Sequence, residues 1–260
     1  MAWEAELLVA IEAAGAAAAV LHNHADGPLR VFHKGDVNLV TEVDFQCEQA
    51  ITEILRQHTP DIEVLGEETG GAENATTRWV VDPLDGTTNF IHNYPMYCVS
   101  IALEVEGQSV VGVILDPIRQ RTYRAIRGQG AYCGDRPLHV SKCDDVSRAL
   151  IGTGFPYDRR EEAHFYLAYV EAVLRQAQGI RRAGAAAMDL VMVASGVLDG
   201  FWEFNLSTWD VAAGLLLVEE AGGECSSHGG GKVNMVHPSP LATNGLIHEA
   251  MISLLGSVRA

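Results

Sequence analysis

Trp79-Val80-Val81-Asp82-Pro83-Leu84-Asp85-Gly86-Thr87-Thr88-Asn89-Phe90 joins a short apolar run to a polar turn. The apolar run, Trp79 to Val81, predicts a buried strand. Pro83 has no N–H for a strand ladder, so it predicts that the strand ends there or lies at a sheet margin. Asp82 and Asp85 lie three residues apart across the turn. Their carboxylates can therefore converge on one point, and carboxylate oxygens are ligands that Mg²⁺ selects.

The residues after Asp85 predict that the same turn also binds an anion. Gly86 permits a close backbone approach, and Thr87 and Thr88 stand where a helix can begin, so free N–H groups there would face an anion. A metal ion and a phosphate group would then meet at one turn. A purely structural interpretation stays open, because Asp-Gly is a common turn dipeptide and Asp or Thr commonly caps a helix.

Two further segments bring carboxylates to the ends of predicted elements. Gly66-Glu67-Glu68 follows the strand-like Glu63-Val64-Leu65, and Trp209-Asp210 stands at the head of an apolar helix pattern from Val211 to Ala221. Together with the turn, these segments resemble the metal-dependent, lithium-sensitive phosphomonoesterase superfamily, whose best-known members are the inositol monophosphatases. The resemblance covers nearly the whole chain.

Other segments extend this resemblance. Phe201-Trp202-Glu203-Phe204 and Gly152-Thr153-Gly154-Phe155-Pro156 look most like the bacterial inositol monophosphatases. Further matches are Trp209-Asp210-Val211-Ala212-Ala213-Gly214 with Glu219 and Ala221-Gly222-Gly223, Lys34-Gly35 leading to Thr41-Glu42-Val43-Asp44, and Arg181-Arg182-Ala183-Gly184 leading to Ala187-Met188-Asp189-Leu190.

The resemblance implies a set of metal ligands. Glu67, Asp82 and the backbone carbonyl of Leu84 would hold a first Mg²⁺ ion, and Asp82, Asp85 and Asp210 would hold a second. A third, weaker ion would depend on Glu67 and waters, and Mn²⁺ is an alternative metal. Two such cations can bind phosphate oxygens, acidify a water and stabilise the leaving alkoxide.

The resemblance also implies the roles around the reacting phosphate. Thr87, with Asp44 behind it and Glu67 near, would orient the attacking water, and the N–H groups of Gly86 and Thr87 would donate to phosphate oxygens. On the leaving-group side, the residues implied to contact substrate hydroxyls are Asp85, the backbone around Ala186, Glu203 and Asp210.

Three positions leave alternatives open. Thr41 to Asp44 has the spacing of a capping box, so Asp44 is equally well explained as part of a helix cap. Glu203 is equally well explained as the solvent-facing residue of an alternating strand. Many relatives have threonine or serine where this chain has Ala185, and the missing hydroxyl weakens the assignment of inositol as the leaving group.

Composition narrows the class of partner. The chain has 260 residues, 48% of them hydrophobic, which is ample for a sizeable core. A formal charge of −16 and a pI near 4.9 argue against nucleic acid or an anionic membrane as the main partner. An anionic substrate is compatible with this charge where divalent cations neutralise a carboxylate cluster.

Cysteine usage and the N-terminal segment indicate a cytoplasmic protein. The five cysteines are odd in number and form no Cys-x-x-Cys pair, as expected in a reducing compartment. The Ala-rich stretch from Ala5 to Leu21 carries Glu6 and Glu12 and follows no basic residue. We therefore expect neither a signal peptide nor a membrane span.

The periodicity predicts a layered fold. Trp3 to Leu21 and the segment after Asp44 predict helices, Asp26-Gly27-Pro28 predicts a stop, and Lys34 to Asn38 predicts a mobile, polar loop. The predicted antiparallel strands are Val99–Glu106, Val110–Leu115 and Thr122–Ile126, followed by short strands up to Val140. The later alternation is strand 149–152, helix 161–177, strand 180–182, helix 187–195, strand 200–204 and helix 211–221.

We therefore expect one compact α/β unit over residues 1–260, with subdomains of approximately 1–145 and 146–260. The resemblance implies alternating α/β/α/β/α layers and a homodimer. The leading functional hypothesis is a Mg²⁺-dependent phosphatase of myo-inositol monophosphate. The alternatives are the same chemistry on histidinol phosphate, fructose 1,6-bisphosphate or another small phosphate, and a binding or regulatory protein that keeps the fold without turnover.

Overall fold

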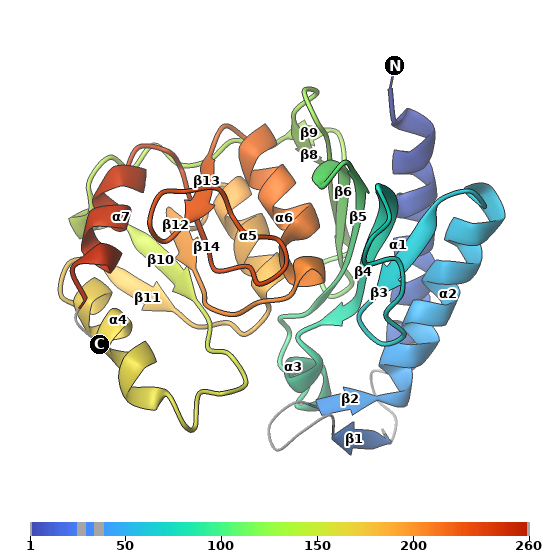
Figure 1. The fold of residues 1–260 in the computed structure, drawn as a ribbon, viewed down its shortest axis with the longest axis horizontal. Helices are drawn as coiled ribbons and strands as arrows, with labels where there is room; N and C mark the ends of the chain where they lie inside the picture. Colours follow the sequence, from blue (N-terminus) through green and yellow to red (C-terminus); the bar gives the residue numbers. More distant parts are fainter. Residues whose placement is uncertain (1, 25–29, 34–38, 259–260) are drawn as a thin grey trace.

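Helices and strands of the chain stack as alternating layers. The structure, a computed structural model, describes residues 2–24, 30–33 and 39–258. In these residues a pair of helices, a sheet, a second pair of helices, a second sheet and an outer pair of helices follow one another (Figure 1). This order confirms the expected α/β sandwich. The helix stop at Asp26-Gly27-Pro28 and the loop at Lys34 to Asn38 lie outside the described residues.

The first half of the chain builds a seven-stranded sheet in the order β3-β4-β5-β6-β7-β8-β9. β3 pairs parallel with β4, and every later pair of neighbours is antiparallel, as the run of β-branched segments and short turns predicted. The strands are β3 (Glu63–Gly66), β4 (Thr77–Asp85), β5 (Cys98–Val105), β6 (Gln108–Asp116), β7 (Arg121–Ile126), β8 (Ala131–Cys133) and β9 (Arg136–Pro137).

β4 corrects one prediction from the sequence. The strand does not end at Pro83 and does not lie at a margin, because it continues to Asp85 between β3 and β5. Its pairing with β5 shifts register between Asp82 and Asp85, which is where Pro83 is accommodated. Its pairing with β3 stops at Val81, so the missing N–H of Pro83 breaks no ladder on that side. α3 (Thr87–Ile91) begins directly after this irregular end, where a helix was expected.

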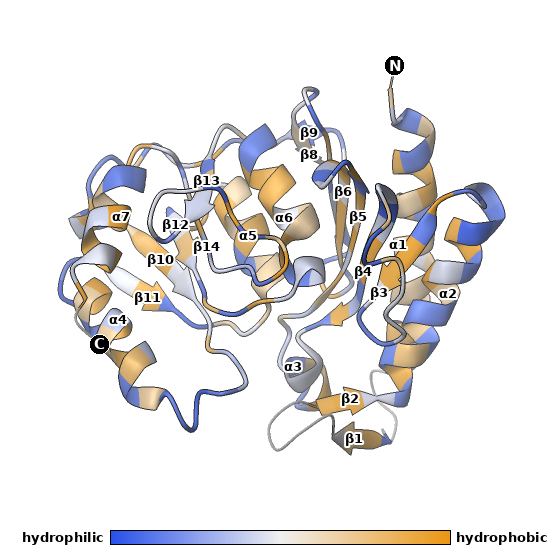
Figure 2. Cartoon of the chain, viewed as in Figure 1, coloured by the Kyte–Doolittle hydropathy of each residue, from blue (hydrophilic) through white to orange (hydrophobic). Residues whose placement is uncertain are grey.

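Two helix pairs cover the seven-stranded sheet. α1 (Glu4–His24) and α2 (Glu42–His58) cover one face, and α5 (Ala186–Ala194) and α6 (Thr208–Glu220) cover the other, between the two sheets (Figure 1). Residues 211–218 of α6 are all buried, and Figure 2 shows that hydrophobic residues predominate along α5 and α6. A helix covered on both sides is expected to be apolar around most of its circumference.

The second half of the chain builds a five-stranded sheet in the order β11-β10-β12-β14-β13. The predicted strands and helices of this half are confirmed to within a few residues, whereas β13, β14 and α7 were not predicted. The elements are β10 (Leu150–Thr153), α4 (Ala163–Leu174), β11 (Gly179–Arg181), β12 (Gly200–Trp202), β13 (Glu224–Ser227), β14 (Pro240–Thr243) and α7 (His248–Gly256), with a small pair β1 (Val31–His33) and β2 (Leu39–Thr41) and a 3-10 turn at Val146–Arg148.

α1 differs from expectation in one respect. Among the described residues it is long and apolar enough to cross a membrane by length and composition alone, despite its three glutamates. Its small side chains Ala10, Ala13, Ala14 and Ala17 are fully buried and belong to the core cluster shared with α2 and the seven-stranded sheet. Core helices pass the same test, so residence in the cytoplasm stays a prediction.

One apolar cluster contains residues of both sheets, from Val80 on β4 to Ala242 on β14, with α5 and α6 between them. A core shared in this way agrees with one compact unit, and the subdomain boundary near residue 145 stays a prediction. All five cysteines are free thiols, and Cys47 and Cys98 are fully buried.

Candidate active site

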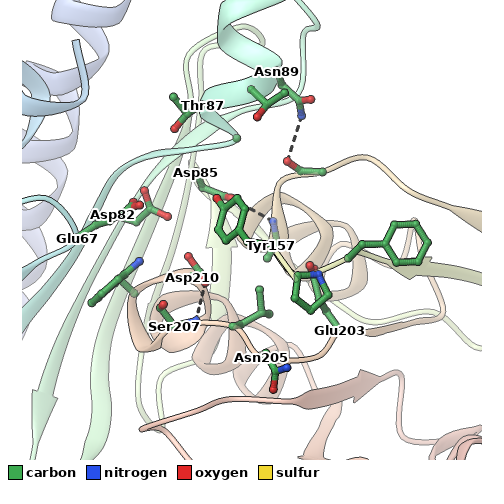
Figure 3. A pocket seen from close by; sticks show the side chains of 18 of the residues that line it. Glu67, Asp82, Asp85, Thr87, Asn89, Tyr157, Glu203, Asn205, Ser207 and Asp210 are labelled. Atoms are coloured by element: carbon green, nitrogen blue, oxygen red, sulfur yellow. Dashed lines mark hydrogen bonds between the residues drawn. The ribbon is translucent and has the colours of Figure 1, made fainter. Parts of the chain in front are cut away.

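A pocket of about 370 Å³ lies where the end of β4 meets the segments before α5 and α6 (Figure 3). Nearly every site residue predicted from the sequence lines it. Asp44 lies outside the lining, behind Thr87. The predicted residues in the lining are Glu67, Asp82, Leu84, Asp85, Gly86, Thr87, Ala186, Glu203 and Asp210.

Asp82 and Asp85 enter the pocket from the irregular end of β4. Asp82 is 1% exposed, and its Oδ1 accepts a hydrogen bond from the Leu84 N–H at 3.0 Å. Asp85 accepts from the N–H groups of Ala186 at 3.2 Å and Ala187 at 2.8 Å. These two donors belong to the first turn of α5, where free N–H groups favour a negative charge. The start of α5 therefore fixes the Asp85 carboxylate.

The carboxylates in the pocket destabilise one another's charged forms. Burial raises the pKa of Asp82 well above its usual value, and repulsion from Glu67, Asp85 and Asp210 raises it further. Burial and then Glu67 and Asp85 likewise raise the pKa of Asp210. Burial raises the pKa of Asp85 to about 6, against the effect of its hydrogen bonds to α5. Such a concentration of buried carboxylates is an environment that a divalent cation stabilises.

The donor set suits Mg²⁺ in its chemistry. Carboxylate and carbonyl oxygens are the ligands that Mg²⁺ takes from proteins. Across the described ranges, no three His, Cys, Asp or Glu side chains stand at metal-ligand spacing around one point. The carboxylates are close enough for repulsion to raise the pKa of Asp82 and Asp210.

Thr87 and Asp44 form a partly buried hydrogen-bonded pair beside this cluster. The Thr87 hydroxyl lies 2.9 Å from Asp44 Oδ1 and 3.2 Å from the Leu84 carbonyl oxygen. The other oxygen of Asp44 accepts from the Thr41 N–H at 2.7 Å and from the Thr41 hydroxyl at 2.6 Å. Asp44 thus completes the capping box of α2 and also contacts Thr87, so the two interpretations of this residue are compatible.

Glu203 occupies the opposite side of the pocket, directly beyond the end of β12. It is 8% exposed, so the solvent-facing interpretation is wrong. Burial and then the charge of Asp189 raise the pKa of Glu203 to about 8, and Arg182 and Arg159 act in the opposite direction. The β-ladder ends at Trp202, so strand alternation does not decide where Glu203 points.

Comparison with known proteins now decides the family. Residues 3–260 match the inositol monophosphatase family. The chain belongs to this family. It is 40% identical over 254 residues to the inositol-1-monophosphatase of Synechocystis sp., covering 96% of this chain and 88% of that protein. The family and these relatives identify the protein as a phosphatase, a phosphomonoesterase.

The chain is also similar to a second named protein and to a solved structure. The Nus factor SuhB of Pseudomonas aeruginosa is 47% identical over 208 residues, covering 78% of this chain and 77% of that protein. The solved structure of an inositol monophosphatase from Anabaena (Nostoc) sp. PCC 7120 superposes with a TM-score of 0.91 at 40% identity, covering 100% of this chain and 98% of that one. The relatives of this chain therefore include proteins named inositol-1-monophosphatase and proteins named Nus factor SuhB.

Several pocket residues of this family member were missed from the sequence. Tyr157 lines the pocket, although 58% of the residue is exposed. Burial of its hydroxyl and then the charges of the four pocket acids raise its pKa. It directly follows the segment Gly152 to Pro156, which was the available signal. The other lining residues outside the predicted site are Thr88, Asn89, Phe155, Pro156, Arg159, Arg182, Gly184, Asn205, Leu206, Ser207 and Trp209.

The segment before α5 joins the pocket through Asn89. The Asn89 side-chain amide donates to the Met96 carbonyl oxygen at 2.6 Å and to the Ala183 carbonyl oxygen at 3.0 Å, so it holds α3 against this segment (Figure 3). Ala185, the departure from the family pattern, is the N-cap of α5 and makes no side-chain capping bond. It is 2% exposed, and the N–H group of the next residue, Ala186, donates a hydrogen bond to Asp85.

Proposed function

We propose that this phosphatase hydrolyses myo-inositol monophosphate to inositol and phosphate with the help of Mg²⁺. The observation that carries the proposal is the convergence of Glu67, Asp82, Asp85 and Asp210 on one pocket beside Thr87, whose hydroxyl contacts Asp44. A binding protein without turnover would have no use for this combination of oxygen donors and a held hydroxyl.

The proposed metal ligands are those implied by the family. Glu67, Asp82 and the Leu84 carbonyl oxygen hold one ion, and Asp82, Asp85 and Asp210 hold a second; a third, weaker ion beside Glu67 is part of the proposal. Bound Mg²⁺, or Mn²⁺ in its place, supplies positive charge to the phosphate and the leaving alkoxide and acidifies the attacking water.

Asp44 and Thr87 orient the nucleophile. An ionised carboxylate is an acceptor, so Asp44 takes the hydrogen bond from the Thr87 hydroxyl, which leaves a lone pair of Thr87 free to accept from water. The attacking water gives up a proton to solvent, the new oxygen–phosphorus bond forms as the ester bond breaks, and the alkoxide leaves with a proton from solvent. In this proposal the N–H groups of Gly86 and Thr87 donate to phosphate oxygens.

The substrate class follows from the opposite side of the pocket. Glu203, Asp210 and Asp85 offer oxygen acceptors, and the backbone at Ala186 borders them, which suits a leaving group with several hydroxyls. Arg159 and Arg182 line the same pocket. These two cations could bind the second phosphate of a substrate such as fructose 1,6-bisphosphate. Histidinol phosphate carries an ammonium group, which could pair with the Glu203 carboxylate.

A second candidate function rests on the relatives named Nus factor SuhB, among them the one at 47% identity. In this alternative the protein has a regulatory role on the same fold. Homodimer assembly, residence in the cytoplasm and inhibition by lithium complete the first proposal and are expectations from the family. The two candidates predict different responses to removal of a metal ligand.

The experiment that tests the proposal measures phosphate release from inositol 1-phosphate, histidinol phosphate, fructose 1,6-bisphosphate and a nucleoside monophosphate, each with Mg²⁺ and with chelator. We expect inositol 1-phosphate to be fastest and all release to stop with chelator. Faster release from another ester would keep the chemistry and replace the substrate. Absence of metal-dependent release from every ester would favour the regulatory role.

Asp210→Asn provides the matched test of the ligand set. Loss of one carboxylate should lower turnover at limiting Mg²⁺ by roughly 10- to 100-fold. Asp135→Asn, which removes an exposed charge in the turn between β8 and β9, is the control and should leave turnover unchanged. Full turnover of the Asp210→Asn protein would contradict the proposed second metal position.

A further inference from the structure

Glu48 is a buried carboxylate on α2 that does not line the pocket. It is 1% exposed and accepts hydrogen bonds from the chain directly after Glu67. The Glu68 N–H lies 2.7 Å from Oε2, and the N–H and hydroxyl of Thr69 lie 2.9 Å and 2.6 Å from Oε1. Buried carboxylates need such donors, and here they come from the turn that carries Glu67.

The turn is built to receive this carboxylate. A Cβ added at Gly66 would stand 2.5 Å from Glu48 Cδ, so glycine at this position allows the side chain to lie against the backbone. The N–H of Gly66 donates to the Gly70 carbonyl oxygen at 3.1 Å, and the Gly70 N–H donates back at 3.0 Å. The Glu67 N–H donates to the Val81 carbonyl oxygen on β4. The backbone around Glu67 is therefore fixed from α2, from β4 and from within the turn.

The same helix also supports the other side of the site. Asp44 lies four residues before Glu48, so the two side chains project from the same face of α2. Asp44 contacts the Thr87 hydroxyl, and Glu48 contacts the turn of Glu67. Thr87 and Glu67 both line the pocket, although 20 residues separate them in sequence. One turn of α2 thus sets the relative positions of two site residues from different segments.

We propose that Glu48 is a positioning residue of the metal site, which acts through the Glu67 turn and sets where the Glu67 carboxylate stands. The inference deepens the proposed function and rests on it, because Glu67 is a metal ligand in that proposal. Glu48 does not line the pocket, so in this proposal it acts without touching the substrate or the ion. Its removal should therefore change metal affinity before it changes the recognition of substrate.

The test measures Mg²⁺ binding by titration calorimetry on the intact protein and on Glu48→Gln. Glutamine keeps the size of the side chain, but its amide cannot accept from all three donors. We expect Mg²⁺ affinity to fall roughly 10-fold, while the KM for the phosphate ester at saturating Mg²⁺ stays unchanged. Thr69→Val, which removes one donor only, should shift Mg²⁺ affinity in the same direction by less.

Glu104→Gln is the matched control. Glu104 is also a buried acid, 2% exposed, and it pairs with Arg78 at 2.8 Å away from the pocket. The Glu104→Gln protein should lose thermal stability and keep normal Mg²⁺ affinity. Unchanged Mg²⁺ affinity in both Glu48→Gln and Thr69→Val, whatever their stability, would overturn the inference. Absence of Mg²⁺ binding by the unaltered protein would instead overturn the proposed metal site, and the inference with it.

Discussion

The hydroxyl of Thr87 has one proton and two neighbouring acceptors, Asp44 Oδ1 at 2.9 Å and the Leu84 carbonyl oxygen at 3.2 Å. Burial raises the pKa of Asp44, whereas its hydrogen bonds from Thr41 and Thr87 lower it again. The charged form is thus held by donors at both oxygens. If the proton of Thr87 points to Asp44, the Thr87 oxygen becomes an acceptor for water, and this direction is what the proposed mechanism requires of the pair.

Asp44→Asn tests that direction. An asparagine amide can donate to Thr87, which turns the Thr87 proton away and removes the acceptor for water. We expect kcat to fall about 10- to 100-fold, with the KM for the substrate and the Mg²⁺ affinity unchanged. Steady-state kinetics at saturating Mg²⁺ measures this.

Thr41→Val separates catalysis from capping in this pair. It removes the hydroxyl that caps α2 but leaves the contact between Asp44 and Thr87. We expect it to lower the free energy of unfolding by about 1 kcal/mol and to keep kcat. An equal loss of kcat in both variants would show that Asp44 acts through the helix cap alone.

At the scale of elements, the ends of β10 and β12 build the leaving-group side of the pocket. The two strands are parallel neighbours, so their carboxyl ends meet at the same edge of the sheet. Gly154 follows β10 and Glu203 follows β12. A Cβ added at Gly154 would stand 2.0 Å from Glu203 Oε2, so the glycine leaves the space in which this carboxylate lies.

Gly154→Ala should therefore displace the Glu203 carboxylate without touching the metal ligands. We expect a loss of kcat/KM on inositol 1-phosphate of about 10-fold or more and a smaller loss on phenyl phosphate, whose leaving group has no hydroxyls. Glu203→Ala should give the same pattern. Equal losses on both esters, measured by phosphate release, would contradict a role of Glu203 in recognising the polyol.

The same elements show what the sequence could predict. Strands and helices with regular periodicity, such as β5 and α6, were found because side-chain burial follows their period. β13 and β14 were missed because Glu224 to Ser227 has no β-branched or aromatic residue and β14 begins at Pro240. The motifs identified the carboxylates of the pocket. Glu48 and Tyr157 were missed because their roles depend on contacts between segments far apart in sequence.

At the scale of the whole molecule, buried ionisable groups link stability to pH. His228 packs its ring against Phe204 with centroids 4.4 Å apart, and its Nε2 lies 3.1 Å from the Pro240 carbonyl oxygen. Burial lowers the pKa of His228 to about 4. The unfolded chain binds a proton near pH 6.5, whereas the folded chain does so only near pH 4. The stability that neutral His228 contributes is present above pH 6.5 and is lost as the pH falls toward 4.

His228→Gln should remove this part of the pH dependence. We expect the free energy of unfolding of the unaltered protein to fall by about 2 kcal/mol more than that of the variant between pH 6.5 and pH 4. Urea denaturation at several pH values measures the difference. His248, whose pKa burial also lowers, stays in both proteins and cancels in the comparison. Parallel curves for the two proteins would contradict the assignment.

The carboxylates of the pocket also lower the stability of the fold, because Asp82 is buried among three other acids. A bound divalent cation should relieve this repulsion. Mg²⁺ at about 100 times its Kd contributes about 2.7 kcal/mol, or a rise in Tm of about 5 to 10 °C for a chain of this size. Asp82→Asn removes one of the repelling charges together with the bridging ligand. In chelator we therefore expect this variant to melt above the unaltered protein, and with Mg²⁺ we expect it to gain little.

Asp199→Asn is the control for that comparison. Asp199 is a buried acid outside the pocket that accepts from the Ser141 hydroxyl at 2.5 Å and the Leu150 N–H at 2.6 Å. Its loss removes structural hydrogen bonds, so this variant should melt below the unaltered protein and still gain the full Mg²⁺ stabilisation. Equal gains from Mg²⁺ in all three proteins would mean that Asp82 holds no ion. Because thermal melting needs no substrate, the result would stand whichever phosphate ester the enzyme cleaves.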